Sequence, residues 1–528
     1  MAGKSSKVHA TLGTPREFGK MTQVQKVCNP VNYGDYIESP LVLLPSQATM
    51  RRTRVVATIG PSSWDPENLE TLFNAGADVF RLNYSHGEPE TKTELYNRIR
   101  SLETDDRTTC ILADLPGPKL RLGEFEGIRV VRNGESIRLL CGLKKHEGPE
   151  FPVEYSGLSA ELKTGDTILL ADGLIRLSVT ESSGKPSSYV DCLVEDGGPL
   201  TSRKGVNVPG TTVDLPAIGE KDRKALAHAI EAGADWIAVS YVRSAEDIRP
   251  AREAIKAAGL HTPIIAKIEH PAALTNLHSI LDAADAVMVA RGDLGVEIPL
   301  EQVPLAQQKI IDAGLMRGMV VIVATQMLES MALNPRPTRA EVSDVSTAIR
   351  HGGTAVMLSG ETASGNHPLA AVETMVKIAN ATEEGMVTSG GTPGALSKFR
   401  STRAVAHAGA ELAKTSGARH ILVATQHGNA PRLVAGYRPD LVVTAVTDRL
   451  RASRRMNLLP GVKSVVVREH ERGSQTMQEA IRMLAAEGTI KPGERIVAIS
   501  GSPLAMRGAT STIRLYRLES DGTISGTE

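Results

Sequence analysis

The stretch that decides the fold is "DWIAVSYVRSAEDIRPAREAIKAAGLHTPIIAKIE", which runs from Asp235 to Glu269. It begins with a short apolar run, continues with a helical pattern that stops at Gly259, and ends with a second apolar run. Strands that are apolar on both faces, alternating with helices whose apolar residues recur about every 3.6 positions, are typical of parallel β-structure covered by helices. The stretch therefore predicts one βα unit and the strand of the next.

The same rhythm extends over most of the chain from Arg54 onward. Eight such apolar runs begin at Arg54, Asp78, Thr109, Asp235, Pro263, Ala286, Val320 and Thr354. Because eight βα units close into a barrel, we predict a (β/α)8 TIM barrel over residues 51–117 and 216–388.

Two further domains are expected. Residues 118–215 interrupt the rhythm with turns and alternating patterns, which predict a small inserted antiparallel β domain hinged near "PGPK" (Pro116–Lys119) and "VNVPGTTVDLP". Residues 389–528 resume the alternation and predict a third domain with an open α/β sheet. Residues 1–50 are expected to be a flexible extension or, alternatively, an organellar leader.

Composition narrows the class of protein. The 528 residues contain 60 Lys plus Arg and 60 Asp plus Glu, so neither nucleic acid nor a membrane is an expected partner. No apolar run is long enough to span a membrane. Cys28, Cys110, Cys141 and Cys192 form no C-x-x-C pair, which favours reduced thiols in a cytoplasmic compartment.

Chemistry is expected at the carboxyl ends of the barrel strands. These ends carry Arg81, Asn83, Ser85, His86, Asp114, Lys267, Glu269, Arg291, Gly292, Asp293, Thr325, Gln326, Ser359 and Glu361. Carboxylates on adjacent strands, Glu269 and Asp293, suit a hard divalent ion such as Mg²⁺. Arg81 and Lys267 suit a phosphoryl group whose charge must be neutralised. The competing interpretation is a set of salt bridges that closes the barrel rim.

Long motifs support one family. From about Arg52 to Leu518 the chain contains "TIGPSS", "RLNYSHG", "DLPGPKLR", "KGVNVPG", "VARGDLGVEIP", "NPRPTRAEVSDV" and "MLSGETASGNHP", and in these it resembles the pyruvate kinases. The resemblance implies that the inserted β domain is a small β-barrel that acts as a lid on the TIM barrel. It also implies a C-terminal α/β domain with a regulatory or oligomerisation role, and a homotetramer. It also implies transfer of the phosphoryl group of phosphoenolpyruvate to ADP, giving pyruvate and ATP.

The resemblance also implies site residues. Glu269 and Asp293 would bind Mg²⁺ or Mn²⁺, and Lys267 would stabilise the transferring phosphoryl group and the enolate. The backbone N–H groups at Gly292 and Asp293 would bind the substrate carboxylate. Thr325 would help to protonate the methylene carbon, with Ser359 as a weaker candidate.

Phosphate and nucleotide contacts are implied in the same way. Arg81 would bind phosphate, and its planar guanidinium suits phosphoryl oxygens. The implied nucleotide contacts are Asn83, His86, Arg121 and Lys204, although Lys204 is also consistent with an ordinary basic rim residue.

One departure from the family concerns K⁺. Many members have Asp-Thr-Lys-Gly-Pro-Glu where this chain has Asp-Leu-Pro-Gly-Pro-Lys, and they bind K⁺ at the equivalents of Asn83, Ser85, Asp114 and the Leu115 carbonyl. Lys119 replaces the glutamate and supplies a tethered positive charge, so K⁺ is expected to be dispensable. The alternative is that Lys119 points to solvent.

A second departure concerns regulation. Members activated by fructose bisphosphate carry a Ser/Thr-rich loop where this chain has "TQHGNA" (Thr425–Ala430), so that effector is not expected. Residues of this loop and of "SGSPLAMRGATST" leave room for another phosphorylated effector: Thr425, Gly428, Ser500, Ser502, Arg507 and Gly508. Alternatively the domain only builds the oligomer.

Two other functions fit parts of the pattern. A different metal-dependent barrel enzyme of the phosphoenolpyruvate/pyruvate class would explain the carboxylates but not the lid. A non-catalytic regulatory paralogue would be favoured by loss of Lys267, Glu269, Asp293 or Thr325, and all four are present.

Overall fold

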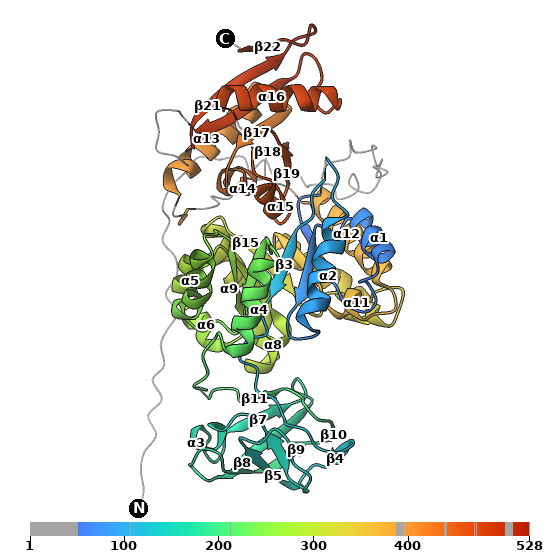
Figure 1. Ribbon diagram of the computed structural model, residues 1–528, viewed down its shortest axis with the longest axis vertical. Coiled ribbons are helices and arrows are strands. Elements are labelled where there is room, and N and C mark those ends of the chain that lie inside the picture. Colours follow the sequence, from blue (N-terminus) through green and yellow to red (C-terminus); the bar gives the residue numbers. More distant parts are fainter. Residues whose placement is uncertain are drawn as a thin grey trace, which may run out of the picture. The chain divides into compact units, whose positions relative to one another are not determined.

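The computed structural model describes residues 51–526, except 106, 212, 387–394, 398, 438–440, 469, 471–472 and 502–509. The expected extension, residues 1–50, lies outside the described residues. From residue 51 onward the described chain contains a barrel, a β-rich insert and a C-terminal α/β region (Figure 1).

Eight parallel strands form a closed barrel in the order β1-β16-β15-β14-β13-β12-β3-β2. They are β1 (Arg54–Thr58), β2 (Val79–Asn83), β3 (Ile111–Asp114), β12 (Trp236–Val239), β13 (Ile264–Ile268), β14 (Ala286–Ala290), β15 (Val320–Ala324) and β16 (Ala355–Leu358). Each contains one of the eight predicted runs, and the predicted TIM barrel is confirmed.

Helices surround the barrel strands (Figure 1). They are α1 (Pro66–Ala75), α2 (Pro89–Arg100), α4 (Glu220–Glu231), α5 (Arg249–Ala257), α6 (Pro271–Thr275), α7 (Leu277–Ala283), α8 (Arg291–Glu297), α9 (Val303–Met316), α10 (Arg339–Arg350), α11 (Gly360–Ala363) and α12 (Pro368–Glu384). Short 3₁₀ turns lie at Ala245–Ile248, Leu300–Gln302 and Glu329–Ala332.

Local sequence explains where these helices begin and end. Gly76 follows α1 with φ 107°, a left-handed conformation that glycine adopts without a Cβ penalty. Thr338 begins α10 with a capping box, because its hydroxyl accepts from Glu341 N while Glu341 accepts from Thr338 N. The single helix expected from Ser244 to Gly259 is instead a 3₁₀ turn followed by α5, which has a proline in its first turn.

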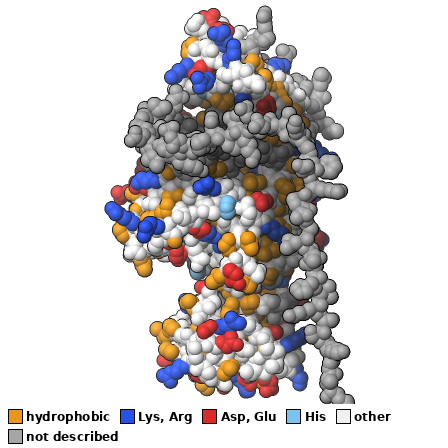
Figure 2. Space-filling view, turned by 180° about the vertical axis from the view of Figure 1, so that it is seen from behind, with side chains coloured by type: hydrophobic (Ala, Val, Ile, Leu, Met, Phe, Trp, Pro, Cys, Tyr) orange, Lys and Arg blue, Asp and Glu red, His pale blue; other side chains and the backbone are white. Residues whose placement is uncertain are grey.

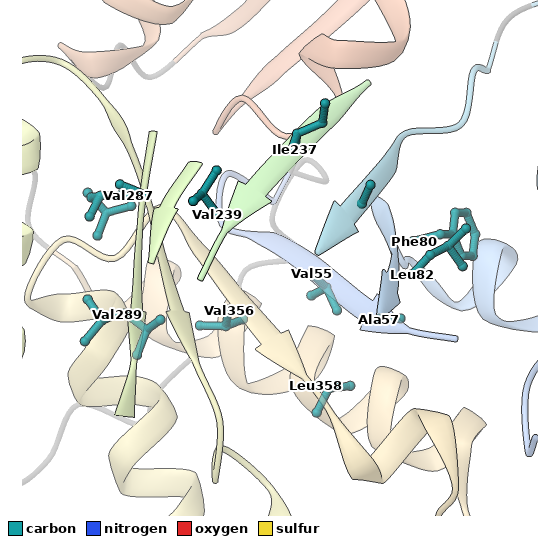
Figure 3. Close-up of a cluster of buried hydrophobic side chains, with 14 of the residues drawn as sticks. Val55, Ala57, Phe80, Leu82, Ile237, Val239, Val287, Val289, Val356 and Leu358 are labelled. Atoms are coloured by element: carbon teal, nitrogen blue, oxygen red, sulfur yellow. The ribbon is translucent and has the colours of Figure 1, made fainter. Parts of the chain in front are cut away.

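Alternate residues of the barrel strands face two different cores. One set packs outward against the surrounding helices and includes Val55, Phe80, Ile237, Val287 and Val356 (Figure 3). The other set includes Val56, Leu112, Ile265, Met288 and Ile322, and belongs to a different apolar cluster. The strands are therefore buried on both faces, as their continuous apolar runs predict.

The insert consists of β4 (Arg129–Val131), β5 (Ser136–Cys141), β6 (Phe151–Val153), α3 (Leu158–Glu161), β7 (Thr167–Leu170), β8 (Ile175–Ser182), β9 (Tyr189–Asp196), β10 (Gly198–Leu200) and β11 (Val206–Asn207). Six strands form a sheet in the order β11-β7-β8-β9-β5-β6, in which β5 and β6 pair in parallel, and β10 pairs with β4. Arg121 bridges to Gly205 beside one edge of the six-stranded sheet, and Leu122 bridges to Val153 at the other. The barrel expected here is thus joined at its seam by isolated bridges rather than by a continuous strand.

The C-terminal region contains α13 (Arg400–Ser416), β17 (His420–Ala424), α14 (Asn429–Gly436), β18 (Val442–Thr447), α15 (Leu450–Met456), β19 (Val462–Val466), α16 (Gly473–Ala486), β20 (Arg495–Gly501), β21 (Thr510–Leu518) and β22 (Ile524–Gly526). Its open sheet has the order β19-β18-β17-β20-β21-β22, with β21 and β22 antiparallel. The predicted open α/β sheet is therefore present.

The amino ends of the barrel strands contact this C-terminal region. The inward-facing cluster of the barrel continues into residues of α13, α14 and α15, and Trp236 Nε1 donates to Arg455 O at 3.1 Å. Arg454 on α15 pairs with Glu103, which follows α2. One apolar core thus joins the barrel interior to the C-terminal region.

The surface bears both signs of charge. On the face in Figure 2, basic and acidic side chains are interspersed. Of the helices within the described ranges, none combines the length and the apolar character needed to cross a membrane. Cys110, Cys141 and Cys192 are buried and free, as expected for reduced thiols, and Cys28 lies outside the described residues.

Candidate active site

A buried ionic cluster lies at the carboxyl ends of β2, β3 and β13. Lys267 Nζ lies 3.1 Å from Asp114 Oδ1 and 3.0 Å from Glu269 Oε1. Arg81 Nε donates to Asp114 Oδ2 at 2.7 Å. The barrel register explains the convergence, since Asn83 of β2 lies opposite Asp114 of β3. Four of the residues predicted from strand ends therefore meet in one network.

In this cluster, burial and ion pairing shift the pKa values of the side chains in opposite directions. Burial alone would raise the pKa of the Asp114 carboxyl, but Lys267 and Arg81 hold it below its usual range. Burial would lower the pKa of Lys267, but Asp114 and Glu269 raise it, so the ammonium stays charged. Burial raises the pKa of Glu269, and Lys267 only partly offsets that rise.

Ser240 and Tyr241 belong to the site, although we did not single them out from the sequence. Lys267 Nζ donates to Ser240 Oγ at 2.7 Å, and Ser240 Oγ donates to the Leu115 carbonyl at 2.8 Å. Tyr241 N donates to Glu269 Oε2 at 2.7 Å from a backbone with φ 52°. The sequence could have indicated both residues, because they directly follow β12, just as other site residues directly follow their own strands.

Asp293 lies on α8 and contacts both the barrel and the lid hinge. Lys119 Nζ donates to Asp293 Oδ1 at 2.9 Å, and Tyr241 OH donates to the same oxygen at 3.2 Å. Burial would raise the pKa of Asp293, but Lys119 holds it low. Lys119 is 24% exposed, so it does not simply point to solvent.

Thr325 has a strained backbone that its neighbours hold in place. Its φ is 68°, which is unusual for a β-branched residue and is typical of functional sites. Arg291 donates to the Thr325 carbonyl at 2.7 Å and to Asp344 at 2.7 Å. Gly292 N donates to Thr325 Oγ1 at 2.7 Å, so the expected short helix does begin beside Thr325. The positioning contacts of Arg291 were not foreseen.

Ser359 follows β16 at the same end of the barrel. Glu361 Oε2 accepts from Ser359 N at 2.7 Å, and its other oxygen accepts from Leu328 N at 3.1 Å. The Ser359 hydroxyl is buried, and it has no hydrogen-bond partner within the described part of the chain. It is therefore free to bond a group that enters the site.

Of the four groups expected to bind K⁺, the oxygens of Asn83, Asp114 and Leu115 already have protein partners. Asp114 is engaged by Arg81 and Lys267, and the Leu115 carbonyl accepts from Ser240. Ser85 N donates to Asn83 Oδ1 at 3.0 Å. Lys119 contacts Asp293 rather than this group of oxygens.

The expected nucleotide contacts lie at the barrel rim and the base of the insert. Burial lowers the pKa of His86, and the nearby cations Arg121 and Lys92 lower it further. Arg121 forms a bridge with Gly205, directly after the exposed Lys204. His86 and Arg121, which are far apart in sequence, are thus close enough to interact electrostatically.

The acidic residues fit a divalent ion that takes few protein ligands. Glu269 and Asp293 supply hard carboxylate oxygens from the ends of neighbouring strands. Among the described residues, no three His, Cys, Asp or Glu side chains converge as a metal site. A divalent ion held here would complete its coordination with water or substrate oxygens, which suits Mg²⁺.

The expected effector loops are only partly described. Thr425 Oγ1 accepts from Gly428 N at 2.9 Å, so this hydroxyl shapes its own loop. Ser500 lies at an irregularity of the pairing between β20 and β21. Ser502, Arg507 and Gly508 lie outside the described residues.

A closed (β/α)8 barrel with paired cations and carboxylates at the carboxyl ends of its strands defines a TIM-barrel enzyme. Residues 50–372 match the family model "Pyruvate kinase, barrel domain", and residues 403–516 match "Pyruvate kinase, alpha/beta domain".

Individual proteins give the same result. A pyruvate kinase of Methylorubrum extorquens is 40% identical over 88% of this chain and 97% of its own length. One of Geobacillus stearothermophilus is 40% identical over 88% of this chain and 80% of its own length. The crystal structure of a Cryptosporidium parvum pyruvate kinase has a TM-score of 0.78 at 31% identity, covering 88% of this chain and 96% of that one. The chain therefore belongs to the pyruvate kinase family, which are phosphotransferases.

Proposed function

We propose that this chain is an active pyruvate kinase that transfers the phosphoryl group of phosphoenolpyruvate to ADP. The observation that carries the proposal is the buried cluster of Lys267, Glu269, Asp114 and Arg81 at the carboxyl end of the barrel. Glu269 and Asp293 would hold Mg²⁺ or Mn²⁺, which would neutralise charge on the phosphoryl and enolate oxygens.

The side chains then have distinct roles. Lys267 keeps its charge beside the reacting phosphoryl group and enolate, and Arg81 binds phosphate oxygens. The backbone N–H groups at Gly292 and Asp293 bind the carboxylate, for which the Gly292 N–H must exchange its bond to Thr325 Oγ1 for one to the substrate. Thr325 helps to deliver a proton to the methylene carbon, and the Ser359 hydroxyl is a second candidate because it is buried and unpartnered among the described residues.

The nucleotide binds at Asn83, His86, Arg121 and Lys204, and the insert acts as a lid over it. Residues 51–117 and 216–388 form the catalytic domain, 118–215 the lid, and 389–528 a regulatory and oligomerisation domain of a homotetramer. The effector is a phosphorylated compound other than fructose bisphosphate. Closure of the lid would protect the phosphoryl group from water.

The test is a coupled assay of pure protein with phosphoenolpyruvate, ADP and Mg²⁺. We expect pyruvate and ATP in equal amounts, and loss of both when the divalent ion is chelated. Absence of pyruvate would contradict the proposal and favour a non-catalytic paralogue. Conversion of pyruvate and an aldehyde without nucleotide would favour another barrel enzyme.

We further propose that the enzyme does not require K⁺. Two observations support this: the Lys119 ammonium contacts Asp293, and Asp114 and Leu115 oxygens already have protein donors. In K⁺-free tetraalkylammonium buffer, we expect added K⁺ to raise activity less than about twofold, because the Lys119 ammonium already supplies a tethered positive charge beside Asp293. Lys119→Glu should restore a many-fold response, whereas Lys144→Glu on the exposed insert should not. A many-fold response of the unmodified protein would contradict the proposal.

A further inference from the structure

Tyr241 bonds to both carboxylates that are proposed to hold the divalent ion. Its backbone N–H donates to Glu269 Oε2 at 2.7 Å, and its phenol hydroxyl donates to Asp293 Oδ1 at 3.2 Å. These three residues follow three adjacent barrel strands, because β12 pairs with β13 and β13 pairs with β14. A single residue after β12 thus contacts the acidic groups that follow the other two strands.

The two carboxylates differ in how the barrel positions them. Glu269 directly follows the last residue of β13, so the pairing of that strand fixes its backbone. Asp293 is the third residue of α8, a helix of seven residues that begins after β14. Because Asp293 lies beyond the strand, the pairing of the barrel does not place its carboxylate, and donors from other elements have to do so.

The donors to Asp293 leave one of its oxygens available. Tyr241 and Lys119 both donate to Oδ1. Within the described ranges, no group donates to Oδ2, which can therefore bind a divalent ion. The two donors differ in charge, because the Lys119 ammonium repels an incoming cation, whereas the neutral phenol orients the carboxylate without opposing the ion.

Tyr241 is held in a strained conformation by its surroundings. Its φ is 52°, in the left-handed region, which is unfavourable for a residue with a Cβ and is typical of functional sites. Ser240 and Val242 are both buried and fix the chain on either side. Gly117 lies against the ring, since a Cβ there would be 3.3 Å from Tyr241 Cδ2. Burial raises the pKa of the Tyr241 phenol, and the two nearby carboxylates raise it further, so the hydroxyl remains a donor.

We propose that Tyr241 is a positioning residue for the divalent ion, which fixes Asp293 relative to Glu269 before the ion binds. The inference rests on the proposed function only in assigning the ion to these two carboxylates. A carboxylate that is already oriented loses less freedom when the ion binds, so the hydroxyl raises the affinity for the ion. Because the hydroxyl acts through Asp293, it affects how much ion is needed rather than the rate once the ion is bound.

Binding of Mn²⁺ to the full chain, without substrate or nucleotide, tests the proposal. Electron paramagnetic resonance measures the free ion, so the result does not depend on turnover. Tyr241→Phe keeps the ring and removes the hydroxyl, and we expect its affinity for Mn²⁺ to fall about tenfold. Tyr189→Phe is the matched control, because Tyr189 OH also donates to a carboxylate, that of Glu181 at 2.9 Å, on the insert. It should change the affinity less than about twofold.

The coupled assay provides a second readout. We expect the Tyr241→Phe protein to need about tenfold more Mn²⁺ for half-maximal activity, with kcat at saturating ion within about twofold of the unmodified value. Weaker Mn²⁺ binding by this variant would support the inference even if neither protein formed pyruvate, a result that would contradict the proposed reaction instead.

Three results would overturn the inference. The first is equal Mn²⁺ affinity in the Tyr241→Phe and unmodified proteins, which would leave the proposed reaction intact. The second is a lower melting temperature of the variant with unchanged Mn²⁺ affinity, because the hydroxyl would then only stabilise the fold. The third is failure of the unmodified chain to bind Mn²⁺ at millimolar concentration.

Discussion

The two ends of the barrel differ in how much charge they bury and in how strained their backbone is. At the carboxyl ends of the strands, Lys267, Asp114 and Glu269 are buried together, and Tyr241 and Thr325 have positive φ values. At the amino ends, the inward-facing residues continue into the apolar core of the C-terminal region. At the carboxyl ends, buried charges and a strained backbone cost stability, whereas at the amino ends apolar packing stabilises the molecule. Substitutions at the two ends should therefore have different consequences.

Replacement of Lys267 should have the largest effect on catalysis. Lys267→Met keeps the bulk of the side chain and removes its charge, so we expect kcat to fall about 10³-fold in the coupled assay. Lys309→Met on the exposed face of α9 is the matched control and should change kcat less than twofold. Circular dichroism would show whether the variant folds. A folded Lys267→Met protein with normal activity would contradict the assigned role.

Gly117 offers a test of the hinge that follows the third barrel strand. It has φ 74°, and a Cβ there would lie 2.6 Å from Ser240 Cβ. Gly117→Ala should lower the free energy of unfolding by about 3 kcal/mol, through backbone strain and overpacking. Gly210→Ala is the control, because its φ is 82° with nothing within 4 Å of the Cβ, and it should cost only about 1 kcal/mol. Equal losses in urea denaturation would show that the contact with Ser240 is unimportant.

Ser240 should act through Lys267 rather than on the substrate. Ser240→Ala removes an acceptor of the lysine, so we expect kcat to fall about tenfold with little change in KM. Ser279→Ala, at an exposed serine of α7, should leave both constants unchanged. A change confined to KM would argue that Ser240 only helps to bind substrate.

Glu103 should affect stability but not catalysis. Burial would raise the pKa of the Glu103 carboxyl, but hydrogen bonds from Arg454 and Thr109 lower it below its value in the unfolded chain, which is near 4.3. The ionised carboxylate therefore stabilises the folded protein above that pH, and this stabilisation is lost as the pH falls through the lower pKa of the folded state. Glu103→Gln should lower the melting temperature at pH 7 by a few degrees, with about 1 kcal/mol lost and kcat unchanged.

The difference between the two proteins should narrow as pH is lowered from 6 toward 3. A constant difference across that range would mean that the carboxylate charge is not what stabilises this contact.

Much of the fold followed from periodicity, because eight apolar runs at βα spacing have one common closed arrangement. The principal site residues followed from the rule that strand ends carry chemistry. Ser240 could have been found by the same rule, because it directly follows β12. Its bond to Lys267 and the bond from Arg291 to Thr325 could not, because no spacing in the sequence reveals such contacts. The contact of Lys119 with Asp293 likewise depends on how the hinge folds back to the barrel.

The bond from Trp236 to the Arg455 carbonyl has a practical consequence for anyone who cuts this chain into pieces. A fragment that ends after α12 would contain every strand of the barrel and every proposed catalytic group, yet the floor of its interior would face water. The barrel domain without the C-terminal region is therefore a poor choice for separate expression, although it contains all the proposed catalytic residues. Chimeras within the family should keep the barrel and α15 from the same parent.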